Sequence, residues 1–195
     1  MKATRVILVR HAEPHEEVHG LVYGRLDPSL SVRGVVQARE LAATLASEPI
    51  AAIYSSPKRR ALETAAPLGE PVVVEGLREM NFGDLEGLTT EEAAERYPGL
   101  VRWMETPSTV TFPGGESAAE LRQRALAAIA EIVARHANET VAVFSHSVVI
   151  RTIIADALAI DRNALFRFEI AYGGISVVEW FDGQPFVRIV NAVRL

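Results

Sequence analysis

Short apolar runs alternate with longer helical segments along this chain, and that alternation limits the possible folds more than any other feature. The runs predicted as strands are Arg5–Val9, Ile50–Ser56, Pro71–Glu75 and Thr140–Phe144. The segments predicted as helices are about Ser31–Ala46, the stretch that opens at Pro57, Thr90–Tyr97, Glu116–His136 and Val148–Leu158. Strands that alternate with helices build βαβ units, in which helices cover both faces of a mostly parallel sheet. The sequence therefore predicts an α/β fold, a three-layer sandwich.

The last part of the chain carries the signal of a β-hairpin. Asp182 and Gly183 stand between two apolar runs, and this dipeptide is typical of a tight turn between antiparallel strands. We expect this antiparallel hairpin at one edge of the sheet. An exposed edge strand there would allow a homodimer.

The segment Glu116–His136 has the strongest helical pattern in the chain. Its apolar residues recur at three- and four-residue spacing, which defines one buried face. On the outer face the spacing predicts two ion pairs, Glu120 with Arg124 and Glu131 with Arg135.

Length and composition fit one domain that spans residues 1–195. The chain has 195 residues, and Gly87–Phe112 is long enough to form only a small cap over a site. The sequence contains no cysteine, which excludes disulfides, thiolate metal sites and cysteine nucleophiles. A formal net charge of −5 disfavours a nucleic-acid partner, and the first apolar run, Val6–Val9, is too short for a signal peptide or a membrane span. We therefore expect a cytoplasmic protein with neither a nucleic-acid nor a membrane partner.

Charged and hydroxyl side chains follow the strands at the points where each strand is expected to end. In chain order they are Arg10 and His11, Ser55 to Arg60, Arg78 and Glu79, and Ser145 to Ser147. Ligands of open α/β sheets bind just beyond the carboxyl ends of the strands, so these residues are expected at one rim. Arginine binds phosphate oxygens in a bidentate manner and stays charged at any working pH. This rim is therefore predicted to bind a phosphate group.

Two histidines among arginines also suit nucleophilic catalysis at phosphorus. A neutral imidazole can attack phosphorus and form a covalent phosphohistidine, which water then hydrolyses. Neighbouring cations lower a histidine pKa and so keep the nucleophile unprotonated. The departing alcohol needs a proton, and Glu79 is the candidate donor. Acidic residues crowd the stretch from Glu75 to Glu95, so Glu79 could instead belong to a solvated acidic face.

Several segments, in order along the chain, resemble motifs of the histidine phosphatase superfamily, also called phosphoglycerate-mutase-like. Those that carry the resemblance are Val9–Pro14, similar to R-H-G-E-T, then Leu26–Ala38, Ser55–Ala65, Leu77–Gly87, Pro113–Ser117 and Val143–Arg151. The resemblance implies a nucleophilic His11, a general acid Glu79, and a phosphate pocket made by Arg10, Arg60 and His146. It also implies a phosphatase of small phosphate monoesters that needs no cofactor and no metal ion.

Some positions depart from the family pattern. Ala12 stands where the family has glycine, and Ser147 and Val148 stand where it has two glycines. Glu17 replaces an asparagine that contacts substrate in many members, and its carboxylate would repel a second phosphate or carboxylate on the substrate. The residues predicted to contact substrate are Glu17, Tyr23, Gly24 and Ser147.

Other functions stay open at this point. A cofactor-dependent phosphoglycerate mutase would use the same residues, although family mutases usually have longer chains that help to close the site. A non-catalytic module that binds a phosphorylated ligand would suit the changed residues beside the two histidines, but simple binding needs no attacking imidazole. A metal site of His11, His146 and Glu79 is the alternative chemistry, which two arginines in the same pocket oppose.

Overall fold

The fold is organised around one mixed sheet. A computed structural model describes residues 3–100 and 103–194, and within these residues six strands form the sheet in the order β3-β2-β4-β1-β5-β6. The strands are β1 (Thr4–Arg10), β2 (Ile50–Ser55), β3 (Val72–Val73), β4 (Thr140–Ser145), β5 (Ile175–Phe181) and β6 (Gln184–Ala192). The first four strands are parallel, whereas β5 pairs antiparallel with β1 and β6 pairs antiparallel with β5. The predicted α/β fold with an antiparallel hairpin at one edge is confirmed.

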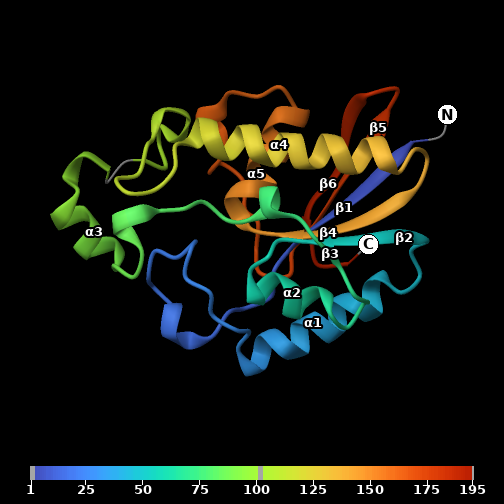
Figure 1. Ribbon diagram of the computed structural model, residues 1–195, viewed down its shortest axis with the longest axis horizontal. Coiled ribbons are helices and arrows are strands. Elements are labelled where there is room, and N and C mark those ends of the chain that lie inside the picture. The colour runs from blue at the N-terminus through green and yellow to red at the C-terminus, as the bar shows by residue number, and fades with distance from the viewer. Residues whose placement is uncertain (1–2, 101–102, 195) are drawn as a thin grey trace.

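Helices lie on both sides of this sheet (Figure 1). They are α1 (Val32–Leu45), α2 (Arg59–Ala65), α3 (Thr90–Arg96), α4 (Ala118–Arg135) and α5 (Ser147–Ala157). α1 packs beside α2 on one side of the sheet, and α4 packs beside α5 on the other. The molecule is thus the three-layer sandwich that the sequence predicts.

The central strands bury apolar side chains on both faces, which explains their unbroken apolar sequences. In β1, Val6 and Leu8 join the core that contains α4 and α5, while Ile7 and Val9 join the core that contains α1. Strand β4 alternates in the same way. Burial on both faces fixes the register of these strands, because a slip by one residue would exchange the two sets of side chains.

The structure shortens or shifts some predicted elements. The strand expected at Pro71–Glu75 is only Val72–Val73, because the chain turns into a short 3₁₀ helix at Glu75–Leu77. Helix α2 begins at Arg59 and not at Pro57. Helix α5 begins at Ser147, so a single residue, His146, links it to β4 where the sequence predicts a three-residue link.

The two ion pairs predicted on α4 have different outcomes. Arg135 and Glu131 do form the expected pair, with 3.4 Å between Nη2 and Oε2. The prediction that Glu120 pairs with Arg124 is wrong. Glu120 instead accepts hydrogen bonds from the backbone N–H and the hydroxyl of Ser117, which completes a capping box at the start of α4. Arg124 points away from Glu120 and bonds elsewhere.

The connections that follow β1 and β4 run to opposite faces of the sheet. The chain leaves β1 towards α1 on one side of the sheet, and it leaves β4 directly into α5 on the other side. Neighbouring parallel strands whose connections run to opposite faces mark a topological switch point, where α/β proteins bind their ligands. The carboxyl ends of β1 and β4 are therefore the expected place for a site.

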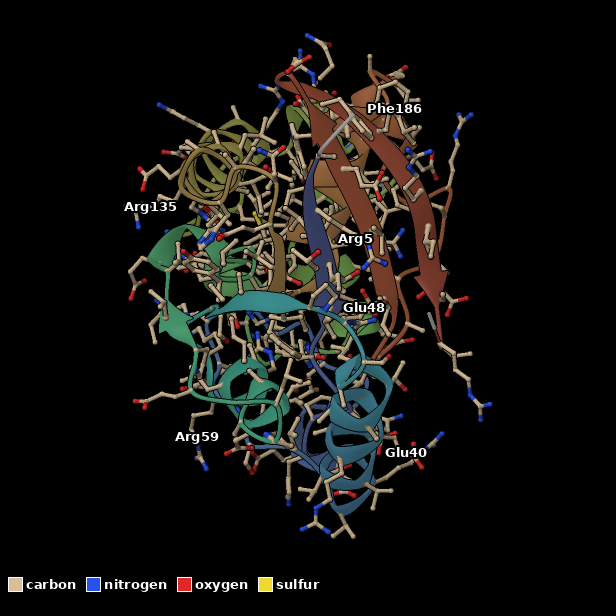
Figure 2. All side chains as sticks on the ribbon, turned by 90° about the vertical axis from the view of Figure 1, so that its right-hand side faces the viewer. Arg5, Glu40, Glu48, Arg59, Arg135 and Phe186 are labelled. Atoms are coloured by element: carbon tan, nitrogen blue, oxygen red, sulfur yellow. The ribbon has the colours of Figure 1, made fainter. Side chains whose placement is uncertain are left out.

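In its described residues, the segment predicted as a cap contains α3 and the short 3₁₀ helices Pro98–Leu100 and Pro107–Thr109. It extends beyond one end of the sheet (Figure 1). At the outer edge of the sheet, Phe186 of β6 is 54% exposed and lies at the surface in Figure 2. The homodimer expected from this edge stays a prediction. In the part of the chain that the structure describes, helices with the length and apolar character needed to cross a membrane are not found.

Candidate active site

His11 and His146 meet at the carboxyl ends of β1 and β4. Arg10 lies opposite Ser145 in the parallel ladder, and the N–H of His11 donates to the carbonyl oxygen of Ser145 at 2.9 Å. The residues that follow the two strands, His11 and His146, therefore lie at neighbouring backbone positions. The two imidazole rings lie 5.2 Å apart between centroids.

The surroundings of His11 keep its ring neutral and determine which ring nitrogen carries the proton. Its Nδ1 lies 2.7 Å from the carbonyl oxygen of Ala12, and a carbonyl can only accept, so Nδ1 holds the hydrogen. Burial holds the pKa of His11 well below the usual histidine value, and the charges of Arg60 and Arg10 lower it further. A neutral ring with a protonated Nδ1 presents a lone pair at Nε2. His11 is thus prepared to act as a nucleophile.

His146 is buried beside it and uses one ring nitrogen for the protein. Its Nε2 lies 2.7 Å from Oγ of Ser56, while its buried Nδ1 has no hydrogen-bond partner. Burial lowers the pKa of His146 well below the usual value, with further contributions from Arg60, His11 and Arg10. A neutral His146 whose Nε2 is occupied can reach a ligand only through Nδ1.

Two arginines stand beside the histidines, and backbone carbonyls hold both. Arg10 Nη1 donates to the carbonyl oxygen of Ile170 at 2.6 Å. Arg60 is fully buried, and its Nη1 and Nη2 donate to the carbonyl oxygens of Leu26 and Gly24 at 2.8 and 3.1 Å. Its neighbour Arg59 points outward from α2 in Figure 2 and pairs with Glu63 at the surface. Of these two adjacent arginines, only Arg60 belongs to the site.

Unpartnered polar atoms gather in this group of residues. Within residues 3–100 and 103–194, the buried side-chain nitrogens and oxygens that lack a hydrogen-bond partner are Arg10 Nε, Arg60 Nε and His146 Nδ1. Buried polar groups are normally hydrogen-bonded, so a cluster of exceptions needs an explanation. Two of these atoms are cationic donors, and an oxyanion would satisfy them. The same described residues bring no three histidine, aspartate or glutamate side chains together as a metal site.

Glu79 is a buried carboxyl, which excludes the solvated acidic face for this residue. Its Oε1 accepts the N–H of Met80 at 2.9 Å, and its Oε2 accepts the N–H of Val148 at 3.4 Å. Burial raises the pKa of Glu79, and the Met80 N–H and the charge of Arg60 oppose this effect only in part. A carboxyl with a raised pKa keeps its proton to a higher pH and can serve as an acid.

Two tyrosines close one side of the arginine pair. The hydroxyls of Tyr23 and Tyr172 lie 2.8 Å apart. The Arg10 guanidinium stacks on the ring of Tyr172, with 3.9 Å to its centroid, and the Arg60 guanidinium lies 5.1 Å from the ring of Tyr23. Burial and the neighbouring Tyr172 raise the pKa of Tyr23, so the hydroxyl stays protonated. The sequence pointed to Tyr23, but Tyr172 carries no motif and is brought here only by the pairing of β5 with β1.

The other residues predicted to contact substrate occupy different surroundings. Gly24 holds Arg60 through its carbonyl, and a Cβ at this position would overlap the carbonyl oxygen of Met80. The hydroxyl of Ser147 accepts a hydrogen bond from Arg151 Nε at 3.1 Å. The side chain of Glu17 is 62% exposed and lies 3.7 Å from His15. Contact of these residues with a substrate stays a prediction.

The residue that replaces glycine after His11 is accommodated without crowding the pocket. Ala12 is fully buried in a small apolar cluster with Leu30 and Ala38. Its N–H donates to Oγ1 of Thr64 at 3.0 Å, so its position is fixed by α2. This methyl group therefore packs into the α1 side of the fold.

Two charged side chains with no predicted role, Glu86 and Arg151, hold the loops around the site. The Glu86 carboxylate accepts hydrogen bonds from the N–H groups of Gly24, Arg25 and Leu26, in the loop whose carbonyls bind Arg60. Arg151 donates to the carbonyl oxygens of Leu165 and Phe168, in the segment that leads to the carbonyl bound by Arg10. Glu86 lies in Leu77–Gly87 and Arg151 ends Val143–Arg151, two segments that resemble family motifs, and this resemblance is the signal that could have found them.

The chain is similar to known proteins over nearly its whole length. Residues 6–193 match the model of the histidine phosphatase superfamily (branch 1). The chain is 38% identical over 193 residues to phosphoserine phosphatase 1 of Hydrogenobacter thermophilus, an alignment that covers 96% of this chain and 92% of the relative. YhfR of Bacillus stearothermophilus superimposes with a TM-score of 0.90 at 32% identity, covering 99% and 98% of the two chains. A phosphoserine phosphatase mutant of Entamoeba histolytica in complex with phosphoserine superimposes with a TM-score of 0.87 at 27% identity. The superposition covers 97% of this chain and 98% of that one.

The unpartnered donors predict that inorganic phosphate stabilises the protein through Arg60. At ten times its dissociation constant, phosphate adds about 1.4 kcal/mol, which raises the unfolding temperature of a chain of this size by about 3–5 °C. In Arg60→Lys the shift should fall below about 1 °C, because an ammonium cannot replace the planar guanidinium. Thermal unfolding with and without phosphate measures this rise in unfolding temperature. Arg59→Lys is the control and should keep the full rise. An equal phosphate-induced rise in both variants would mean that Arg60 does not belong to the anion pocket.

Proposed function

This chain belongs to the histidine phosphatase superfamily (branch 1) and hydrolyses small phosphate monoesters, and from that premise we propose that His11 is its nucleophile and Glu79 its proton donor. The observation that carries the proposal is the group of unpartnered buried atoms of Arg10, Arg60 and His146 beside a neutral His11. Relatives named as phosphatases favour hydrolysis over the mutase and the non-catalytic module.

In the first half of the proposed reaction, Nε2 of His11 attacks the phosphorus of the bound ester. The bond between phosphorus and the ester oxygen breaks, and the leaving oxygen takes the proton of Glu79. Arg10, Arg60 and His146 bind the other three oxygens. His146 does so through Nδ1–H, with its Nε2 accepting the hydroxyl hydrogen of Ser56. Because backbone carbonyls already hold the two guanidinium groups, little reorganisation accompanies the build-up of charge.

In the second half, water attacks the phosphohistidine. The ionised Glu79 takes a proton from that water, the bond between Nε2 and phosphorus breaks, and inorganic phosphate leaves. His11 returns to its neutral form and Glu79 to its acid form. The cycle is balanced in protons and requires neither a metal ion nor a cofactor.

We propose phosphoserine as the substrate class. A relative of 38% identity is named phosphoserine phosphatase 1, and a fold neighbour is a phosphoserine phosphatase in complex with phosphoserine. In the loop before Tyr23, the carboxylate of Glu17 would attract the ammonium group of such a substrate. Glu17 would also repel the carboxylate of phosphoserine, but the ammonium group offsets this repulsion. An ester such as 3-phosphoglycerate has the carboxylate without the ammonium group and would be repelled.

Replacement of His11 tests the nucleophile. His11→Asn keeps a side-chain N–H that can donate to Ala12 but lacks the lone pair at Nε2, so kcat on phosphoserine should fall by about 10³-fold or more. Phosphate release in EDTA measures the loss, and acid-labile phosphate trapped on the wild-type protein should be missing from the variant. Wild-type turnover by His11→Asn would end the covalent scheme.

Replacement of Glu79 tests the acid through the leaving group. Glu79→Gln should lower kcat/KM on phosphoserine by about 10²-fold or more, because a serine alkoxide needs a proton to depart. The loss on p-nitrophenyl phosphate should stay below about 10-fold, since nitrophenolate leaves without one. For wild type, kcat/KM on phosphoserine should decline as the pH rises through the raised pKa of Glu79, because the carboxyl then loses the proton that it donates. His11 should stay neutral and active below pH ~6.5, because its pKa is lowered. Equal losses on both esters would mean that another group supplies the proton.

Replacement of Glu17 tests substrate choice. The ratio of kcat/KM on phosphoserine to that on 3-phosphoglycerate should exceed one in wild type. In Glu17→Gln it should fall about 3- to 5-fold, the size expected for an exposed charge interaction. Glu16→Gln is the matched control, because Glu16 is equally exposed and also faces His15. If both variants keep the wild-type ratio, Glu17 does not contribute to recognition.

A further inference from the structure

Arg124 of α4 points into the protein towards the segment that carries Glu79. Its Nη1 donates to the carbonyl oxygens of Gly76 and Arg78 at 2.9 and 2.5 Å. Its Nη2 donates to the carbonyl oxygen of Glu79 itself at 3.0 Å and to Oε1 of Glu116 at 2.6 Å, and its Nε donates to Oε2 of Glu116 at 3.0 Å. A guanidinium has five N–H donors, and here each has an acceptor.

Glu116 completes this arrangement from the other side of Glu79. Besides its two bonds to Arg124, its Oε1 accepts the N–H of Asn81 at 2.8 Å. Both side chains are largely buried, with 15% of Arg124 and 8% of Glu116 exposed. Arg124 and Glu116, which we call the clasp, therefore fix the backbone both before and after Glu79.

The carboxyl group of Glu79 depends on that backbone path. The hydrogen bonds that reach its oxygens come from two backbone N–H groups, one of them in the next residue, Met80. The raised pKa of Glu79 also requires that the carboxyl stay buried in this position. A shift of the segment would move the carboxyl relative to the leaving oxygen, and a displacement of about 1 Å can cost ~10²-fold in rate.

We propose that Arg124, together with Glu116, is a positioning residue for the acid Glu79, an inference that rests on the proposed role of Glu79. Arg124 bonds to the backbone of this segment and not to the reacting atoms. Its planar fork of donors is what the arrangement uses, and lysine, with three donors on a flexible stem, cannot reproduce it. The clasp therefore acts on proton transfer to the leaving group and leaves phosphate binding to Arg10, Arg60 and His146.

The test compares two esters in Arg124→Lys. We expect kcat/KM on phosphoserine to fall by about 10- to 100-fold and that on p-nitrophenyl phosphate by less than about 3-fold, with the phosphate-induced rise in unfolding temperature unchanged. Arg135→Lys is the matched control on the same helix, since Arg135 points to solvent in Figure 2, and it should behave as wild type. A merely structural role would lower the rates on both esters equally, and that result would overturn the proposal.

A double variant separates this proposal from the role of Glu79. If Arg124 acts through Glu79, adding Arg124→Lys to Glu79→Gln should produce little further loss on phosphoserine. Multiplied losses would overturn the proposal, whereas equal losses on both esters in Glu79→Gln alone would instead overturn the role of Glu79. If Arg124→Lys proves too unstable to assay, Glu116→Gln carries the same comparison, because it keeps the shape of the side chain and removes its charge. If Glu116→Gln kept the wild-type ratio of kcat/KM on phosphoserine to that on p-nitrophenyl phosphate, the proposed role of the clasp would be overturned.

Discussion

The parallel pairing of β1 with β4 is the contact on which the rest of the site depends. It brings together two strand ends that are more than 130 residues apart in the chain and places His11 beside His146. Because both strands are buried on both faces, the register is fixed, and with it the distance between the rings. A topological switch point lies between them because the chain leaves these two strands towards opposite sides of the sheet.

The two arginines of the pocket are held in a way that keeps their charge available. The groups that fix them are carbonyl oxygens of Ile170, Leu26 and Gly24, which have no net charge. A carboxylate in the same places would neutralise the guanidinium groups and weaken their attraction for an oxyanion. Their positive field also lowers the pKa of both histidines, after the larger effect of burial. One arrangement thus prepares both the proposed anion pocket and the proposed nucleophile, a neutral His11.

The sequence predicted most of the fold and most of the residues that meet in the candidate site, because both depend on local patterns. Apolar runs located the strands, and the residues just after them, such as His11 and His146, could be assigned to one rim. What it missed depends on contacts between distant segments. The predicted partner of Arg124 was wrong because helical spacing favours Glu120. The actual acceptors are the carboxylate of Glu116, just before α4, and backbone carbonyls of a segment nearly fifty residues earlier. Tyr172 carries no motif, and only the pairing of β5 with β1 shows its place.

The strand order also affects how the molecule can form during synthesis. The strand nearest the N-terminus lies inside the sheet, between β4 and β5, so both of its neighbours are made in the last third of the chain. Until then its apolar residues and unpaired backbone groups have no native cover, which is the state in which chains aggregate. Chaperones that bind extended apolar segments would therefore meet Arg5–Val9 early, and folding should be cooperative and late. Shortened products that stop before β4 would contain His11 but lack His146 and Tyr172, the two rings that lie beside it.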